Sequence, residues 1–243
     1  METFLSNVQN MLSTVMQSQI ESMQRASEVL ANTLVAGRHI FVFGTGHSHM
    51  IAEEAFYRAG GLKDIIPILE SGLMLHEGGV KSTKLERLEG YAAVLLDTYQ
   101  VSQGDVLILS SNSGINAVPV EMALGAKERG ATVIAITNLK QSMQGLPRHS
   151  SQLRCYEIAN IVIDNCGVVG DASVYVEEMQ QYIGPTSTII GAFILNAIIV
   201  QTVKNCLAQG LVPPVYVSAN VAKGDAHNAQ LRNNPPSGGS EDC

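Results

Sequence analysis

Residues 107–138 read LILSSNSGINAVPVEMALGAKERGATVIAITN and combine two strand patterns with a helical one. It begins as an apolar strand, passes through the polar run Ser110–Gly114, continues as a helical pattern over 116–129 and ends in a second apolar strand. A strand, a helix and a second strand joined in this way form a unit whose two strands are parallel. A turn needs only one or two small polar residues, so this longer run indicates that a ligand binds there.

The same alternation of strands and helices runs through the rest of the chain. The strands are apolar without strict alternation, which is typical of a parallel sheet whose two faces are both covered by helices. The sequence therefore predicts an α/β fold, and such sheets bind ligands beyond the carboxyl ends of their strands. We expect strands at 39–43, 64–69, 105–110, 132–137 and 160–164, and helices at 3–36, 49–61, 84–97, 116–129 and 187–209.

The chain divides into three parts. Residues 1–37 carry apolar side chains at helical spacing, so we expect an N-terminal segment of one or more helices that makes oligomer contacts. Residues 38–232 hold all the expected strands and form the main domain. Residues 233–243 are rich in Pro, Gly and Ser and are expected to be a flexible tail.

Composition limits the partners. The chain has 243 residues, a formal net charge of -7 and no basic run, so we expect no nucleic-acid partner. Only 15% of residues are charged, which favours surface hidden between subunits and hence a homodimer or homotetramer. The most apolar window, Ile189–Val200, spans 12 residues and is too short to cross a bilayer. With no signal peptide recognisable, we expect a cytoplasmic protein without membrane contact.

No motif for a cofactor or a metal is recognisable. The chain lacks G-x-G-x-x-G and G-x-x-x-x-G-K-[ST], so neither a dinucleotide nor ATP is expected. The four cysteines form no C-x-x-C pair, and His47 and His49 have no third ligand at a metal-binding spacing. We therefore expect neither a cofactor nor a metal ion.

Two loops have the composition of an anion site. Gly44–Ser48 follows the first strand, and Ser110–Gly114 precedes the helix at 116–129. A helix start leaves backbone N–H groups without partners and carries a partial positive charge. Serine hydroxyls add neutral donors, and a glycine lets the backbone approach a ligand closely. The second loop therefore suits a phosphate monoester.

The stretch VFGTGHSHMIAEEAF, the stretch 107–138 and the stretch YIGPTSTIIGAFILNAIIVQT resemble the sugar isomerase (SIS) domain family. The resemblance implies a three-layer αβα sandwich with a five-stranded parallel sheet, flavodoxin-like or Rossmann-like, and a sugar phosphate as the ligand. In the family the S-x-S-G turn holds the phosphate. By this resemblance the phosphate- and sugar-binding residues are Thr45, Gly46, Ser48, Ser111, Ser113, Gly114, Thr186, Ser187 and Thr188. Further candidates in or beside the same loops are Gly44, His47, Asn112 and Asn116.

Within the family the layout is similar to phosphoheptose isomerase and, more distantly, to N-acetylmuramic acid 6-phosphate etherase. The chain departs from phosphoheptose isomerases at functional positions. Asn116 stands where they carry a third phosphate-binding Ser, and Arg58 stands near the position of their catalytic Glu. The last helix has no counterpart of their catalytic His. The resemblance therefore implies phosphosugar binding more strongly than heptose isomerisation.

An acid–base pair must then come from other residues. The candidates are Glu54 on the helix after the first strand, and His76 and Glu77 in the connection after the second strand. Aldose–ketose isomerisation needs a base for the proton between C1 and C2 and an acid for ring opening. We expect such an isomerase, with Glu54 or Glu77 as base and His76 assisting ring opening. A lyase or etherase on an amino-sugar phosphate and a non-catalytic phosphosugar sensor are the alternatives.

Overall fold

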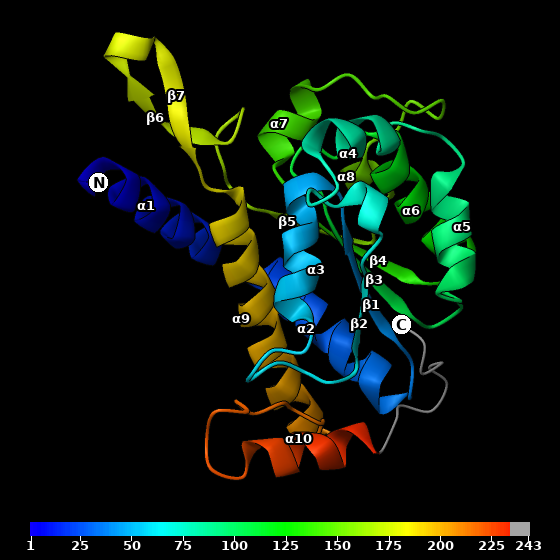
Figure 1. The fold of residues 1–243 in the computed structure, drawn as a ribbon. Coiled ribbons are helices and arrows are strands. Elements are labelled where there is room, and N and C mark those ends of the chain that lie inside the picture. The colour runs from blue at the N-terminus through cyan, green and yellow to red at the C-terminus, as the bar shows by residue number, and fades with distance from the viewer. Residues whose placement is uncertain (234–243) are drawn as a thin grey trace.

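A five-stranded parallel sheet lies at the centre of the computed structural model, which describes residues 1–233 (Figure 1). Its strands lie in the order β2-β1-β3-β4-β5, and every neighbouring pair is parallel. Apolar, mainly β-branched and aromatic residues fit such a doubly covered sheet. The predicted α/β fold with five parallel strands is confirmed. The strands are β1 (Ile40–Gly44), β2 (Ile65–Ile68), β3 (Val106–Ser110), β4 (Thr132–Thr137) and β5 (Ile161–Asp164).

Helices cover both faces of the sheet and make the predicted three-layer αβα sandwich (Figure 1). Along β1, Ile40 and Val42 belong to one apolar core, and Phe41 and Phe43 belong to the other. Each core therefore fills the space between one face of the sheet and its own helices. The first includes α2 (Ile20–Val35), α3 (Met50–Ala55) and α9 (Ser187–Ala208), and the second includes α5 (Tyr91–Thr98), α6 (Ala117–Glu128) and α8 (Cys155–Ile158).

A two-stranded hairpin that the sequence analysis did not predict projects from the domain beside α1 (Glu2–Ser18) (Figure 1). Its antiparallel strands are β6 (Ala172–Val176) and β7 (Gln181–Pro185), joined by η3 (Glu177–Met179). Asn7 Nδ2 on α1 donates a hydrogen bond to the backbone oxygen of Ser173 at 2.8 Å. The remaining elements are η1 (Gly46–His49), η2 (Ser71–Leu73), α4 (Gly79–Leu85), α7 (Leu139–Gln144) and α10 (Gly224–Arg232).

Two helices differ from their sequence patterns. The helix expected over 49–61 is only α3, because Phe56 is extended and Tyr57 adopts a left-handed φ of 47°. The helix expected over 84–97 is divided between α4 and α5, because Gly90 takes a left-handed conformation with a φ of 88°. In both places the apolar pattern continues across a backbone turn.

The helix α9 has 22 residues and is long and apolar enough, by length and composition, to cross a membrane. It is longer than the 12-residue window 189–200 because the helix continues to Ala208. Its inner face, with Ile190, Ile194 and Ile198, is buried in the first core. A buried core helix passes the same test of length and composition, so α9 does not indicate membrane insertion.

The helical part expected over 1–37 consists of α1 and α2, which meet at Gln19. The segment 38–232 carries the sheet and the remaining helices. Of the tail expected over 233–243, residues 234–243 lie outside the described residues.

Candidate functional site

The carboxyl ends of β1 and β3 lie side by side, with Gly44 and Ser110 as register partners. The two polar loops of the sequence therefore begin next to each other. The strand order reverses at this point, because β2 lies on one side of β1 and β3 lies on the other. In open α/β sheets, ligands bind in the crevice at such a switch point.

The first loop turns sharply directly after β1. A side chain at Gly44 would place its Cβ 2.3 Å from the backbone oxygen of Ser48, so only glycine fits there. Thr45 is buried, and its hydroxyl donates a hydrogen bond to Glu86 Oε2 at 2.7 Å. Glu86, which the sequence analysis did not single out, thus brings a carboxylate to this loop.

The S-x-S-G turn after β3 is closed by one of its own serines. Ser111 is buried, and its Oγ accepts a hydrogen bond from the Gly114 backbone N–H at 3.1 Å. Gly114 has a φ of 62°, and a Cβ there would lie 3.0 Å from Ser142 Oγ. The Ser113 hydroxyl makes no hydrogen bond within residues 1–233. The turn uses Ser111 for its own geometry and leaves Ser113 available to a ligand.

Asn112, between these serines, is held by other side chains. Asn165 Nδ2 donates to Asn112 Oδ1 at 2.8 Å, and Asn112 Nδ2 donates to Gln141 Oε1 at 3.4 Å. Asn165 follows β5 directly and is buried. Because both polar atoms of Asn112 have partners, its amide orientation is fixed by the surrounding network.

The start of α9 is capped by a carboxylate from another part of the chain. Asp171 Oδ1 accepts hydrogen bonds from the backbone N–H groups of Thr186 at 3.0 Å and Ser187 at 2.8 Å. Its Oδ2 accepts one from the Ser187 hydroxyl at 2.6 Å. Thr186 and Ser187 are therefore engaged with Asp171, whereas the Thr188 hydroxyl has no partner in the described part of the chain.

A small pocket opens between these segments. The hydroxyl groups of Ser48, Ser110 and Thr188 line it without a hydrogen bond to any described residue, so they are available to a ligand. The lining residues are His47, Ser48, Ile51, Ser110, Asn112, Ile136, Asn165, Ser187, Thr188 and Gly191. The other candidate residues lie in the surrounding turns and helix starts: Gly44, Thr45, Gly46, Ser111, Ser113, Gly114, Asn116 and Thr186.

The start of α6, directly after the S-x-S-G turn, has no side-chain cap. Asn116 occupies the N-cap position, but its Oδ1 accepts a hydrogen bond from Arg148 Nη1 at 2.8 Å instead of capping the helix. The Val118 N–H donates to the backbone oxygen of Glu86 at 3.0 Å, and Pro119 has no N–H. Of the helical positions 117–119, only Ala117 therefore keeps a backbone N–H without a partner within residues 1–233, and the helix start adds its partial positive charge.

Both predicted catalytic carboxylates are held in ion pairs. Glu54 Oε1 accepts a hydrogen bond from Asn196 Nδ2 at 2.8 Å, and its Oε2 lies 2.8 Å from Arg58 Nη1. Glu77 is exposed and accepts a hydrogen bond from Lys81, which holds the pKa of Glu77 below its ordinary value. A carboxylate with a lowered pKa is a weaker base, whereas a catalytic base benefits from a raised one.

His76 lies close to the first loop. Its ring centroid is 6.1 Å from that of His49. His49 is buried, with Nδ1 2.6 Å from the Gly46 backbone oxygen and Nε2 3.1 Å from Glu53 Oε1. Of the two rings, His76 is the exposed one and is therefore the one that a ligand or solvent can contact.

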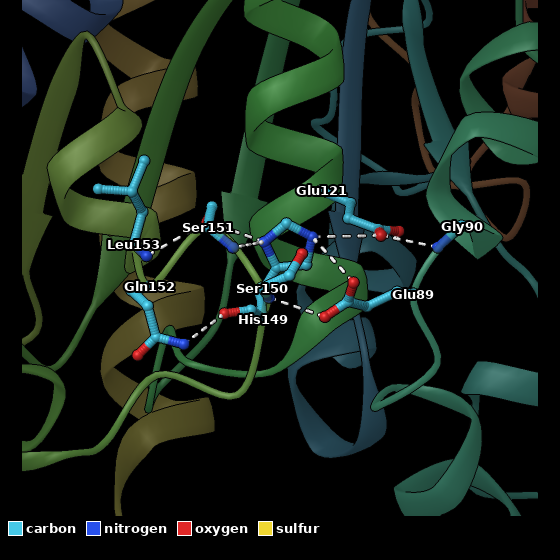
Figure 2. A network of polar contacts seen from close by, with 8 residues as sticks. All are labelled: Glu89, Gly90, Glu121, His149, Ser150, Ser151, Gln152 and Leu153. Carbon is cyan, nitrogen blue, oxygen red and sulfur yellow. Dashed lines mark hydrogen bonds and ion pairs between the residues drawn. The ribbon is translucent and has the colours of Figure 1, made fainter.

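Glu89, Glu121 and His149 form a polar cluster near the start of α5 (Figure 2). Their ligand atoms lie within 4.8 Å of one another, a spacing that suits a metal ion. However, the Ser151 backbone N–H donates to His149 Nδ1 at 3.1 Å, so in the neutral ring the proton lies on Nε2. A metal ion would need the lone pair of Nε2, which this proton occupies, so the arrangement does not suit a metal. The cluster instead joins two loops by hydrogen bonds.

The strand order, with glycine- and serine-rich loops at the switch point, defines a flavodoxin-like α/β ligand-binding domain. The SIS domain family model matches residues 3–138. The chain belongs to the SIS domain family. It is 40% identical over 231 residues to a UPF0309 protein of Shouchella clausii, covering 95% of this chain and 94% of that protein. It is 43% identical over 222 residues to a UPF0309 protein of Halalkalibacterium halodurans, covering 91% and 92%.

Solved structures share the fold at low identity. A phosphoheptose isomerase from Neisseria gonorrhoeae is 16% identical, with a TM-score of 0.52 over 82% of this chain and 95% of that chain. The Vibrio vulnificus NanR protein complexed with ManNAc-6P is 13% identical, with a TM-score of 0.50 over 86% of this chain and 66% of that chain. At these identities the likeness shows the fold alone.

Sequence reasoning missed four polar residues that the fold brings to this region: Glu86, Arg148, Asn165 and Asp171. The sequence does mark Asn165 as a candidate, because it directly follows an expected strand, as the serine run at Ser110 does. The other three lie in loops or at a helix end far along the chain from the groups they contact, and no local pattern marks them.

Proposed function

We propose that the crevice binds a phosphorylated sugar, with the phosphate at the S-x-S-G turn and the start of α6. The observation that carries the proposal is a set of donors without partners around an uncapped helix start, namely the Ser113 hydroxyl and Asn116 Nδ2. Neutral donors at a helix N-terminus suit a phosphate monoester. The Arg148 guanidinium beside Asn116 adds a positive charge.

The sugar lies over the adjacent pocket. The hydroxyls of Ser48, Ser110 and Thr188 are free to bind sugar oxygens, and Ile51 and Gly191 supply apolar surface. The NanR protein complexed with ManNAc-6P and the phosphoheptose isomerase have the same fold, which supports a phosphosugar as the ligand class.

Isothermal titration calorimetry tests binding with glucose 6-phosphate, N-acetylmannosamine 6-phosphate and sedoheptulose 7-phosphate, with the unphosphorylated sugars as controls. We expect at least one phosphorylated sugar to bind and its unphosphorylated counterpart to bind at least tenfold more weakly. Thermal unfolding gives a second readout, because a ligand at 100 times its Kd stabilises the fold by about 2.7 kcal/mol. Equal binding of phosphorylated and unphosphorylated sugars, or no binding in the whole panel, contradicts the proposal.

The activity proposed for the site is aldose–ketose isomerisation. A base removes the proton from one of the two carbons C1 and C2 and returns it to the other, while an acid opens the sugar ring. His76, beside the first loop, assists ring opening. For the base, Glu86 joins the predicted Glu54 and Glu77, because Glu86 lies at the first loop and is outside the ion pairs that hold the other two.

Proton exchange with solvent tests the isomerase. In deuterated water, turnover by an enzyme of this kind incorporates deuterium at the sugar carbons C1 or C2, which NMR detects. We expect Glu86→Gln and His76→Asn to lower turnover by about 100-fold, a typical general acid–base contribution, while binding stays within about threefold. Glu54→Gln and Glu77→Gln are the matched variants, and a larger loss in either one assigns the base there.

Two other functions have distinct outcomes in the same experiment. A lyase or etherase on an amino-sugar phosphate releases an unsaturated sugar or a cleaved side group. A non-catalytic sensor binds the sugar phosphate and leaves it unchanged. The sensor is supported by the structure of the NanR protein complexed with ManNAc-6P, which has the same fold.

For assembly and location we propose a homodimer or homotetramer in the cytoplasm. The small charged fraction of 15% supports the oligomer, as do exposed apolar side chains on α1 and on the hairpin. A sugar phosphate as ligand supports the cytoplasm.

A further inference from the structure

An asparagine at an N-cap usually turns its side-chain oxygen toward the first N–H groups of the helix. Asn116 does not, because its Oδ1 accepts the hydrogen bond from Arg148 Nη1 at 2.8 Å. A guanidinium only donates, so this contact defines which end of the amide is oxygen. Asn116 is 7% exposed, and its Nδ2 has no partner among residues 1–233. The amide nitrogen of this buried residue is thereby left as a donor at the start of α6.

The segment that carries Arg148 is fastened to the S-x-S-G turn. The Arg148 backbone N–H donates to the Ile115 oxygen at 2.9 Å, and the Cys155 N–H donates to the Gly114 oxygen at 2.9 Å. These two bonds hold the ends of the segment 148–155 against the turn. The position of the guanidinium is therefore set by the backbone as well as by Asn116.

The cluster in Figure 2 fixes the middle of the same segment. His149 Nε2 lies 3.4 Å from Glu121 Oε1, on α6, and the Ser150 backbone N–H donates to Glu89 Oε1 at 2.7 Å. Glu121 Oε1 also accepts a hydrogen bond from the Gly90 N–H at 2.7 Å. Arg148 is thus the first residue of a segment whose two ends are bonded to the turn before α6 and whose His149 contacts Glu121 on α6.

We propose that Arg148 is a positioning residue of the phosphate site: it turns Asn116 into a donor and gives the site its preference for a dianionic phosphate. Serine and threonine hydroxyls rotate to suit a ligand, but an amide presents either its oxygen or its nitrogen. An anion site with Asn at this position therefore needs a group that holds the oxygen away. The inference rests on the proposed phosphosugar binding. It adds Arg148 as the residue that leaves the Asn116 amide nitrogen free to donate to the phosphate.

A double-mutant cycle on the full chain tests this, with glucose 6-phosphate and inorganic phosphate as probes in calorimetry. If glucose 6-phosphate shows no binding in the proposed-function panel, the panel sugar that binds replaces it. Arg148→Met removes the donor and the charge but keeps the length of the stem. Asn116→Ser replaces the amide by a hydroxyl that needs no orientation. Arg129→Met, at the far end of α6, removes one positive charge from the same helix and is the matched control.

We expect Arg148→Met to weaken binding by at least tenfold in the parent chain and by less than threefold in the Asn116→Ser background. Arg129→Met leaves affinity unchanged. Affinity of the parent rises with pH as the phosphate loses its second proton, with a pKa of about 6, and this rise is reduced in Arg148→Met. Melting temperatures without ligand show whether each variant is folded.

The outcomes separate the two proposals. If the parent chain binds no phosphate ligand, the proposed function fails. If the parent binds and Arg148→Met binds equally well, the function stands and the role of Arg148 is wrong. An equal loss in both backgrounds shows that Arg148 acts by charge alone, and this overturns its action through Asn116.

Discussion

The Asp171 carboxylate and the Ser187 hydroxyl form a hydrogen bond of 2.6 Å that closes the base of the hairpin segment. The segment between these two residues forms β6, η3 and β7, which project from the domain, and the chain then enters α9. The same carboxylate accepts the first N–H groups of α9, so one side chain fixes both the hairpin and the pocket end of that helix.

Asp171→Asn should destabilise the fold by about 1 kcal/mol, because it removes the charge that interacts with the helix dipole and weakens the cap. Asp171 has a φ of 68°, and asparagine tolerates this left-handed conformation, so the backbone is not strained by the change. In a chain of this size the melting temperature should fall by about 2–4 °C. Scanning calorimetry measures it, and an unchanged melting temperature contradicts the capping role.

The hairpin should carry a subunit contact. Tyr175 and Tyr182 are register partners with ring centroids 5.1 Å apart, and Tyr182 and Ile183 are 59% and 44% exposed. Light scattering of the parent at micromolar concentration should give a dimer or tetramer. The double change Tyr182→Ser and Ile183→Ser should shift it to a smaller species, since exposed aromatic side chains dominate such interfaces.

Val94→Ser is the control for the hairpin, because Val94 is also strongly exposed but lies on α5. It should leave the molar mass unchanged. A parent chain that is monomeric at this concentration contradicts the prediction. A hairpin variant with the same molar mass as the parent also contradicts it.

Ser111 and Ser113 should separate stability from binding. Ser111→Ala removes the acceptor of the Gly114 N–H and should cost about 1 kcal/mol of unfolding free energy. Ser113→Ala should leave stability unchanged and weaken sugar-phosphate binding at least tenfold, about 1.4 kcal/mol. Denaturant unfolding and calorimetry on both variants measure the two effects. Loss of stability in Ser113→Ala, or parental binding by it, goes against this division of roles.

Asp64 should make the fold less stable at neutral pH than a neutral side chain would. Burial raises the pKa of Asp64 despite Lys63 Nζ at 3.7 Å. A carboxyl group whose pKa is raised in the fold stabilises it below its unfolded pKa, about 3.9, and loses that contribution as pH rises through the folded pKa. Asp64→Asn should therefore melt higher than the parent at pH 7. The difference should shrink as the pH falls toward 4, and a variant that melts lower at pH 7 contradicts the prediction.

The sheet could be predicted from the sequence because its strands are apolar on both faces. The run 132–137 coincides with β4, and the run 105–110 begins one residue before β3. The hairpin could not be predicted, because most of its residues are exposed or half-buried and show no apolar pattern. The end of α3 was missed because Phe56 and Tyr57 continue the helical pattern where the backbone turns.

The candidate site was predictable where it consists of strand ends. The loops that begin at Gly44 and Ser110 follow from the rule that parallel strands place their carboxyl ends at one edge. Arg148 and Asp171 act on the two helix starts from 32 and 16 residues away, a distance over which the sequence shows no periodicity. Which hydroxyls stay free of protein partners depends on these contacts, and only the fold shows them.

Ser27 on α2 accepts a hydrogen bond from Asn205 on α9 at 3.1 Å, although 178 residues separate them in the chain. During synthesis α2 leaves the ribosome long before α9, the helix that packs against it. Met23, Ala26 and Leu30 therefore lack the α9 side chains of their shared core until α9 has emerged. Such exposed apolar surface favours aggregation in incomplete chains. A chain that is cut short before α9 therefore leaves this face of α2 without its cover.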